Sequence, residues 1–157
     1  MVPDRDAPDR GASDRDAPDR GARDRDLAGR PRQARPRDAL GQPLPYGTPG
    51  VEAVPEVALP PLETVRAARE LVAAGRPFAA HEVLEARWKA GPPAENDLWQ
   101  GLAQICVGLT HRARGNPVGA QRLLDRGAER LAAYGNGAGP TYGVNIPAVI
   151  GCARQAG

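Results

Sequence analysis

The chain has 157 residues, with 21 basic and 19 acidic side chains and a formal net charge of +2. This near balance of charge implies no basic patch, which argues against nucleic acid as a partner. No apolar run is long enough to span a membrane. The charged, proline-rich N-terminus lacks the apolar segment of a secretory signal, so we expect a cytoplasmic protein. Cys106 and Cys152 have neither zinc-finger spacing nor a disulfide framework, and we predict that both are buried thiols.

Residues 1–40 are predicted to form a disordered arm. A charged decapeptide occurs as DRDAPDRGAS at 4–13 and DRDAPDRGAR at 14–23, and a decayed third copy follows. Such a segment contains too little apolar surface to offset the entropy lost on ordering. An arm of this kind could bind RNA or a protein partner, but the interleaved Asp residues would cancel the attraction of Arg for phosphate. Residues 41–61 continue with Pro and Gly and are predicted to form an extended leader.

From residue 62 onward, apolar residues recur at spacings of three and four, which is typical of amphipathic helices. Gly75 fits a helix C-terminal cap, Asn116 fits an N-cap, and Pro77 and Pro117 fit first helical positions. The predicted helices cover 62–74, 77–90, 95–114 and 117–134, with a short fifth helix after Asn145. Because no segment alternates with period two for long, residues 62–157 are predicted to form an all-α domain, a compact bundle of four to five helices.

Polar residues interrupt the apolar faces of the second and third predicted helices. At about 100° per residue, His81 and Glu85 share one stripe with Phe78 and Trp88. The third helix has its own polar face, bordered by Gly101 and Gly108, which would let another helix approach closely. If the short connection pairs these two helices, their polar groups meet in one partly buried cluster. The candidate site residues are His81, Glu82, Glu85, Trp88, Trp99, Gln100, Gln104 and His111.

Trp88 and Trp99 are predicted to be core anchors rather than stacking platforms. A buried indole N–H needs a hydrogen-bond acceptor, and Glu85 or the glutamines of the cluster would serve. Cys106 lies on the opposite side of the third helix from the polar face, so it is expected to be structural.

The polar cluster has three interpretations. A hydrogen-bonded network could fix the register of two helices without any chemistry. A divalent metal or a small ligand could bind instead, because His81 and Glu85 at i,i+4 can reach one ion and His111 could supply a third ligand. In a catalytic version, Glu82 or Glu85 acts as a general base, although HEVLE has Glu85 where the zincin motif HExxH has its second histidine.

Three segments resemble a family of small bacterial and archaeal helical domains known as domain of unknown function 309. They are PFAAHEVLEARWK at 77–89, LWQGLAQICVGLTHRARGN at 98–116 and GAQRLL at 119–124, and the resemblance spans about 62–134. It implies a compact helical bundle and no established activity. The residues that match the motifs of the family are His81, Glu82, Glu85, Trp88, Gln100, Gly101 and His111.

The sequence therefore predicts an uncharacterised helical domain with a polar cluster between two helices. This cluster binds a small ligand or a protein partner, or it has a structural role. The alternative is a metal-dependent, hydrolase-like enzyme that uses the HEVLE segment. The substrate, the oligomeric state and the identity of any metal are left open.

Overall fold

The computed structural model describes residues 37–45, 50 and 57–156, which all belong to one unit of the chain, residues 36–157. Residues 1–36 of the predicted disordered arm, and residues 46–49 and 51–56 of the predicted leader, lie outside the described residues. The described part is all-α, as predicted, and its only strand-like pairing is an isolated bridge between Arg37 and Pro43. The elements are α2 (Pro61–Ala73), α3 (Pro77–Ala90), the 3-10 helix η1 (Pro93–Glu95), α4 (Asn96–Ala113), α5 (Pro117–Gly135) and α6 (Ile146–Ala156).

Local signals explain where the helices begin and end. α3 and α5 start with Pro at the first helical position, where its missing N–H leaves no intrahelical hydrogen bond unmade. At the N-terminus of α5, the Asn116 side chain accepts a hydrogen bond from the backbone N–H of Gly119 at 3.0 Å. α2 ends before Gly75, whose φ of +74° is a left-handed conformation that favours glycine. These four signals were predicted from the sequence, and all are confirmed.

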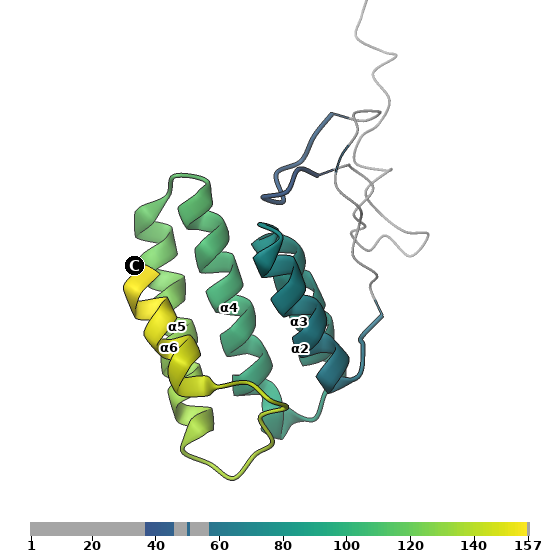
Figure 1. Ribbon diagram of the computed structural model, residues 1–157, viewed down its shortest axis with the longest axis vertical. Coiled ribbons are helices and arrows are strands. Elements are labelled where there is room, and N and C mark those ends of the chain that lie inside the picture. The colour runs from purple at the N-terminus through teal and green to yellow at the C-terminus, as the bar shows by residue number, and fades with distance from the viewer. Residues whose placement is uncertain (1–36, 46–49, 51–56, 157) are drawn as a thin grey trace, which may run out of the picture. The chain divides into compact units, whose positions relative to one another are not determined.

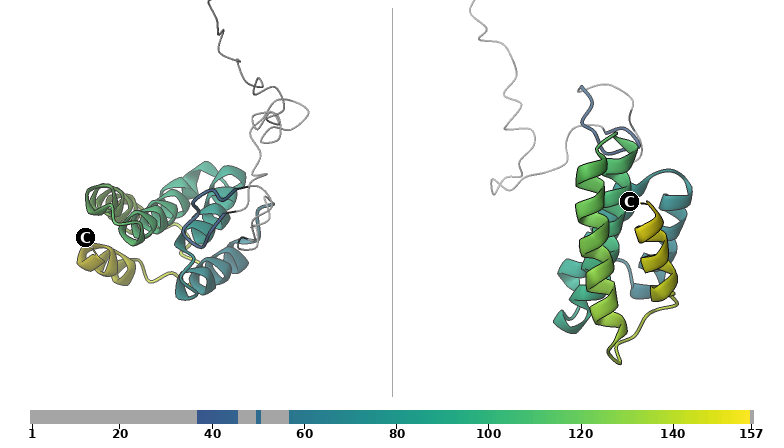
Figure 2. Two further views of the ribbon diagram at one scale, coloured as in Figure 1. Left: turned by 90° about the horizontal axis from the view of Figure 1, so that it is seen from above. Right: turned by 90° about the vertical axis from the view of Figure 1, so that its left-hand side faces the viewer.

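Consecutive helices pack against one another, with α4 between α3 and α5 (Figure 1). α2 packs on α3, and α6 packs on α5. Seen from above, α2 and α6 lie on the same side of α4 (Figure 2). Because α2 and α6 form no extensive contact with each other, one face of α4 lies between them without a helix packed over it.

The core is centred on α4 and α5. Its largest fully buried side chains include Leu84, Leu98, Trp99, Leu124 and Leu131. Glycines set the close spacing of the two helices, because a Cβ added at Gly108 would lie 2.8 Å from Leu124 Cγ. A Cβ at Gly127 would likewise lie 2.6 Å from Ile105 Cγ1. The predicted close approach at the glycines of α4 is confirmed, and the helix that makes it is α5.

Residues 37–43 form a turn that contacts the ends of α3 and α4, although 37–40 belong to the predicted arm. Asp38 Oδ1 accepts hydrogen bonds from the backbone N–H groups of Leu40 and Gln42, both at 2.9 Å. The Arg114 guanidinium donates to the carbonyl of Leu40, and lies 5.7 Å from the centre of the Phe78 ring. The turn is therefore attached to the bundle. None of the described helices combines the length and the apolar character needed to cross a bilayer.

Candidate functional site

The predicted pair on α3 is present. His81 Nε2 lies 3.2 Å from Glu85 Oε2, and Lys89 Nζ lies 2.7 Å from Glu85 Oε1. Burial lowers the pKa of His81 below its ordinary value, and the Glu85 carboxylate, which raises this pKa, offsets only part of the effect. Its Nδ1 is buried and has no hydrogen-bond partner among the described residues. His81 is therefore a mostly buried imidazole that contacts Glu85 through Nε2 and lies 5.4 Å, between ring centres, from Phe78.

The polar residues of α4 do not all join this pair. Gln104 has a buried Oε1 without a hydrogen-bond partner in the described part of the chain, and Gln100 is half-buried. His111 lies in the last turn of α4, where its Nδ1 is 3.0 Å from Asn116 Nδ2 in an exposed contact. Glu82 is half-buried on α3.

The predicted metal ligands are held by different contacts. His81 pairs with Glu85 on α3, whereas His111 contacts Asn116 just after α4. Within residues 37–45, 50 and 57–156, no group of three or more His, Cys, Asp or Glu side chains is placed to hold a metal ion. The structure thus does not bring His81, Glu85 and His111 together as a set of metal ligands.

A second polar group, which the sequence did not indicate, lies at the other end of α4. The indole N–H of Trp99 donates to Glu95 Oε2 at 3.0 Å, so its acceptor is neither Glu85 nor a glutamine, and that prediction is wrong. The Tyr142 hydroxyl donates to Glu95 Oε1, and its ring stacks on Trp99 with 5.6 Å between ring centres. This hydrogen bond, with burial, raises the pKa of Tyr142.

The Glu95 contacts hold the loop between α5 and α6. Tyr142 has a φ of +51°, a conformation that is uncommon for residues other than glycine, and Gly143 follows at +80°. Tyr134 on α5 also contributes, because its hydroxyl donates to the Pro140 carbonyl at 2.6 Å. The sequence signal that could have found this group is a single acidic residue, Glu95, four positions before a tryptophan. Through these contacts, the loop just before α6 is attached to the start of α4.

The tryptophans and cysteines are only partly as predicted. Trp99 is fully buried, and Trp88 is half-buried and packs against the core. Cys106 is buried, which raises its pKa to about 12 and makes it a poor nucleophile. Cys152 is exposed on α6, contrary to the prediction that both thiols are buried, because the side of α6 that carries it is not covered by another helix.

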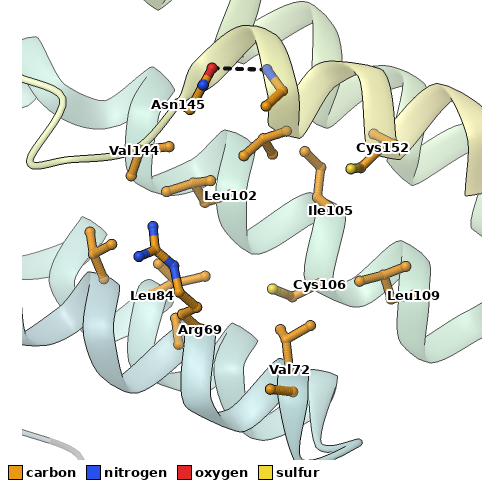
Figure 3. A pocket seen from close by; sticks show the side chains of 16 residues that line it. Arg69, Val72, Leu84, Leu102, Ile105, Cys106, Leu109, Val144, Asn145 and Cys152 are labelled. Carbon is orange, nitrogen blue, oxygen red and sulfur yellow. Dashed lines mark hydrogen bonds between the residues drawn. The ribbon is translucent and has the colours of Figure 1, made fainter.

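An apolar pocket of about 550 Å³ lies where α2 and α6 leave α4 uncovered (Figure 3). Its floor is formed mainly by α4, with Leu84 of α3, and its walls are α2 and the start of α6. None of the eight candidate site residues lines it. The lining residues are Val65, Ala68, Arg69, Val72 and Ala73 from α2, Leu84 from α3, Leu102, Ile105, Cys106 and Leu109 from α4, and Val144, Asn145, Ala148, Val149, Cys152 and Ala153 from α6 and the residues just before it.

Comparison with known proteins finds a family model that matches the central helices. Residues 65–123 match the model of the family described as Domain of unknown function (DUF309). The resemblance inferred from the three sequence segments is thereby confirmed. The uncharacterised protein YpuF of Bacillus subtilis (strain 168) is 44% identical to the chain over 48 residues, which are 30% of this chain and 28% of that protein. No solved structure matches the chain significantly.

The matched segment contains only part of the pocket. The α2 and α4 sides fall within residues 65–123, whereas the α6 side, from Val144 to Ala153, lies beyond it. The chain matches just over a quarter of the Bacillus protein, whose description is that of an uncharacterised protein.

Proposed function

We propose that this chain is a binding module, and that a small apolar ligand occupies the pocket between α2, α4 and α6. The size and lining of the pocket support this function. Its volume of about 550 Å³ lies within the range of about 300–1,000 Å³ that is usual for small-molecule sites, and 14 of its 16 lining residues are apolar.

Small side chains keep the pocket open. Ala68 and Ala73 on α2 lie on one side, and Ala148 and Ala153 on α6 lie on the other. An alanine side chain ends at Cβ, so these two walls cannot fill the space between them as leucines would. A ligand that covers the apolar walls gains about 25 cal/mol of binding free energy for each Å² of apolar surface that it removes from water.

The polar cluster has a different proposed role. His81 and Glu85 form an i,i+4 pair on α3 whose contacts are consistent with a structural or partner-binding element. A metal-dependent hydrolase is less well supported, because no three His, Cys, Asp or Glu side chains among the described residues are placed to hold a metal ion. Binding in the pocket is therefore the function that the geometry favours.

The test is the uptake of N-phenyl-1-naphthylamine, an uncharged fluorescent probe that brightens in apolar sites, by the full chain. Wild-type protein is expected to bind it with saturation. Ala148→Trp narrows the pocket from α6 and is expected to weaken binding at least about tenfold. Ala133→Trp, an exposed alanine on α5 outside the pocket, is the matched control and should bind like wild type.

Absence of saturable uptake by wild-type protein would overturn the proposed function. Equal binding by Ala148→Trp and wild type would also overturn it, because the probe would then lie elsewhere. Thermal melts of both tryptophan variants show whether loss of binding reflects loss of the fold.

A further inference from the structure

One end of the pocket carries a positive charge. Arg69 is the only charged residue among those that line the pocket, and none of them is acidic. Figure 3 shows its side chain extending from α2 across the pocket toward Val144 and Asn145. Within residues 37–45, 50 and 57–156, no carboxylate or carbonyl pairs with Arg69.

The other polar lining residue is Asn145, and its side-chain oxygen is already engaged. Asn145 Oδ1 accepts a hydrogen bond from the backbone N–H of Ala148 at 3.1 Å, where it caps the first turn of α6. The guanidinium of Arg69 is thus the only charged donor among the residues that line the pocket. Arg69 is exposed, and an anionic group is favoured in a ligand that covers its guanidinium, because a guanidinium removed from water without an acceptor is costly.

Apart from Asn145, the rest of the pocket is apolar. Along α4 it extends from Leu102 to Leu109, two turns of helix or about 10 Å. Figure 3 places Leu102 near the Arg69 end, and Leu109 and Cys152 at the far end. An apolar chain that lies along this floor would have its head at Arg69 and its tail near Cys152.

We propose that the ligand is a single-chain amphiphile with a carboxylate head, such as a medium-chain fatty acid, whose carboxylate is bound by Arg69. This inference rests on the proposed function of the pocket. It adds a chemical class, because a purely apolar ligand would leave Arg69 unused and a cationic amphiphile would be repelled by it.

Competition against the bound probe tests the class of ligand on the full chain, below the micellar concentration of each competitor. The competitors are decanoate, decanol and decyltrimethylammonium, which share an alkyl chain and differ in charge. Wild type is expected to bind decanoate and to bind the cation more weakly than decanol. Arg69→Gln should weaken decanoate about tenfold while decanol stays within about twofold of wild type.

Arg66→Gln is the matched control, because Arg66 is an exposed arginine on the same helix that does not line the pocket. It should leave all three affinities unchanged. If Arg69→Gln weakens decanoate and decanol equally, or weakens neither, the carboxylate assignment is overturned although the pocket still binds the neutral probe. If the probe itself is not taken up, the proposed function fails instead.

The position of the bound chain has its own readout. Cys152 is exposed and lines the far end of the pocket, whereas Cys106 is buried with a raised pKa. Bound decanoate is expected to slow modification of Cys152 by a thiol reagent at least about threefold, and Cys152→Ser should abolish the signal. Binding of decanoate with no protection of Cys152 would overturn the proposed placement.

Discussion

The two faces of α4 differ in how they arise. On the face toward α3, the His81–Glu85 pair and Gln104 lie on consecutive helices joined by a short turn. On the other face, the pocket combines α2, α4 and α6, which are separated by whole helices in the chain. The first region is marked by polar residues at unusual positions in apolar helices. The pocket is formed by small and apolar residues that are common in helices. It exists only because α2 and α6 leave a gap over α4.

The comparison also shows what each region depends on. The polar pair needs only α3, because its members are one helical turn apart. The pocket needs the whole arrangement, since its α6 wall is positioned by a loop whose Tyr142 is held by Glu95 at the start of α4. We therefore expect mutations that alter packing or this loop to affect the pocket, and mutations at His81 to leave it intact.

The largest effect is expected where the two regions share their scaffold. Gly108→Val places a side chain 2.8 Å from Leu124 Cγ and forces α4 and α5 apart, with an expected cost of about 3 kcal/mol in the free energy of unfolding. The affinity for the probe should fall together with this stability. Urea denaturation measures the free energy of unfolding, and probe titration measures the affinity.

The control for this substitution is Gly151→Ala on α6, where a Cβ would meet nothing within 4 Å. Alanine has the higher helix propensity, so stability should be unchanged or raised by up to about 1 kcal/mol. A Gly108→Val protein as stable as wild type would contradict the tight packing of α4 and α5.

A smaller effect is expected at the Glu95 contacts. Glu95→Ala leaves the buried indole N–H of Trp99 without its acceptor and releases Tyr142, with an expected loss of about 2 kcal/mol. Because Tyr142 holds the loop before α6, probe affinity should fall even where the protein stays folded. Denaturation curves and probe titrations at a temperature well below the melting point separate the two effects.

Glu129→Ala is the matched substitution at an exposed glutamate of α5, and it should change stability by less than about 0.5 kcal/mol. If Glu95→Ala behaved like Glu129→Ala, the loop would not depend on the Glu95 contacts.

The smallest effect is expected at His81, and it should spare the pocket. His81→Ala removes a mostly buried imidazole and its contact with Glu85, which should cost about 1 kcal/mol at pH 7.5. Its pKa is lowered in the folded state, so the unfolded state binds the proton more readily. The contribution of His81 is therefore present above its unfolded pKa of about 6.5 and is lost as the pH falls through the folded value. The stability difference between wild type and His81→Ala should shrink between pH 7.5 and pH 5.

His111→Ala retains His81 and should retain the pH-dependent loss of stability seen in wild type. Probe affinity of His81→Ala should equal that of wild type at pH 7.5. A loss of probe binding in this variant would show that the two regions are coupled, against the separation described above.

Helix positions could be predicted closely because their signals are local. The predicted range 77–90 is that of α3, since Pro77 at its start and the Gly-Pro-Pro segment at its end act on their own backbone. The third helix is predicted one residue early, from 95, because Pro92 and Pro93 favour a short 3-10 turn that ends at Glu95. In that turn Glu95 is buried and accepts hydrogen bonds from distant residues, which no local pattern indicates.

The candidate site could be predicted only in part. An i,i+4 pair such as His81 and Glu85 follows from helical periodicity alone. Whether His111 joins it depends on the register of two helices, which the sequence pattern constrains only loosely. In the structure His111 lies in the last turn of α4 and contacts Asn116 instead.

By itself, the sequence determined an all-α domain, the ends of its helices, the glycines that permit close packing, and the polar pair on α3. These properties depend on residues within one or two helical turns of each other, or on the size of a single side chain. The tertiary structure alone decided that Glu95 holds Tyr142, that Cys152 is exposed, and that α2 and α6 stand apart over α4. Such features depend on how segments far apart in the chain pack together. Arg69 lies at the end of a pocket only because α2, α4 and α6 pack in this arrangement.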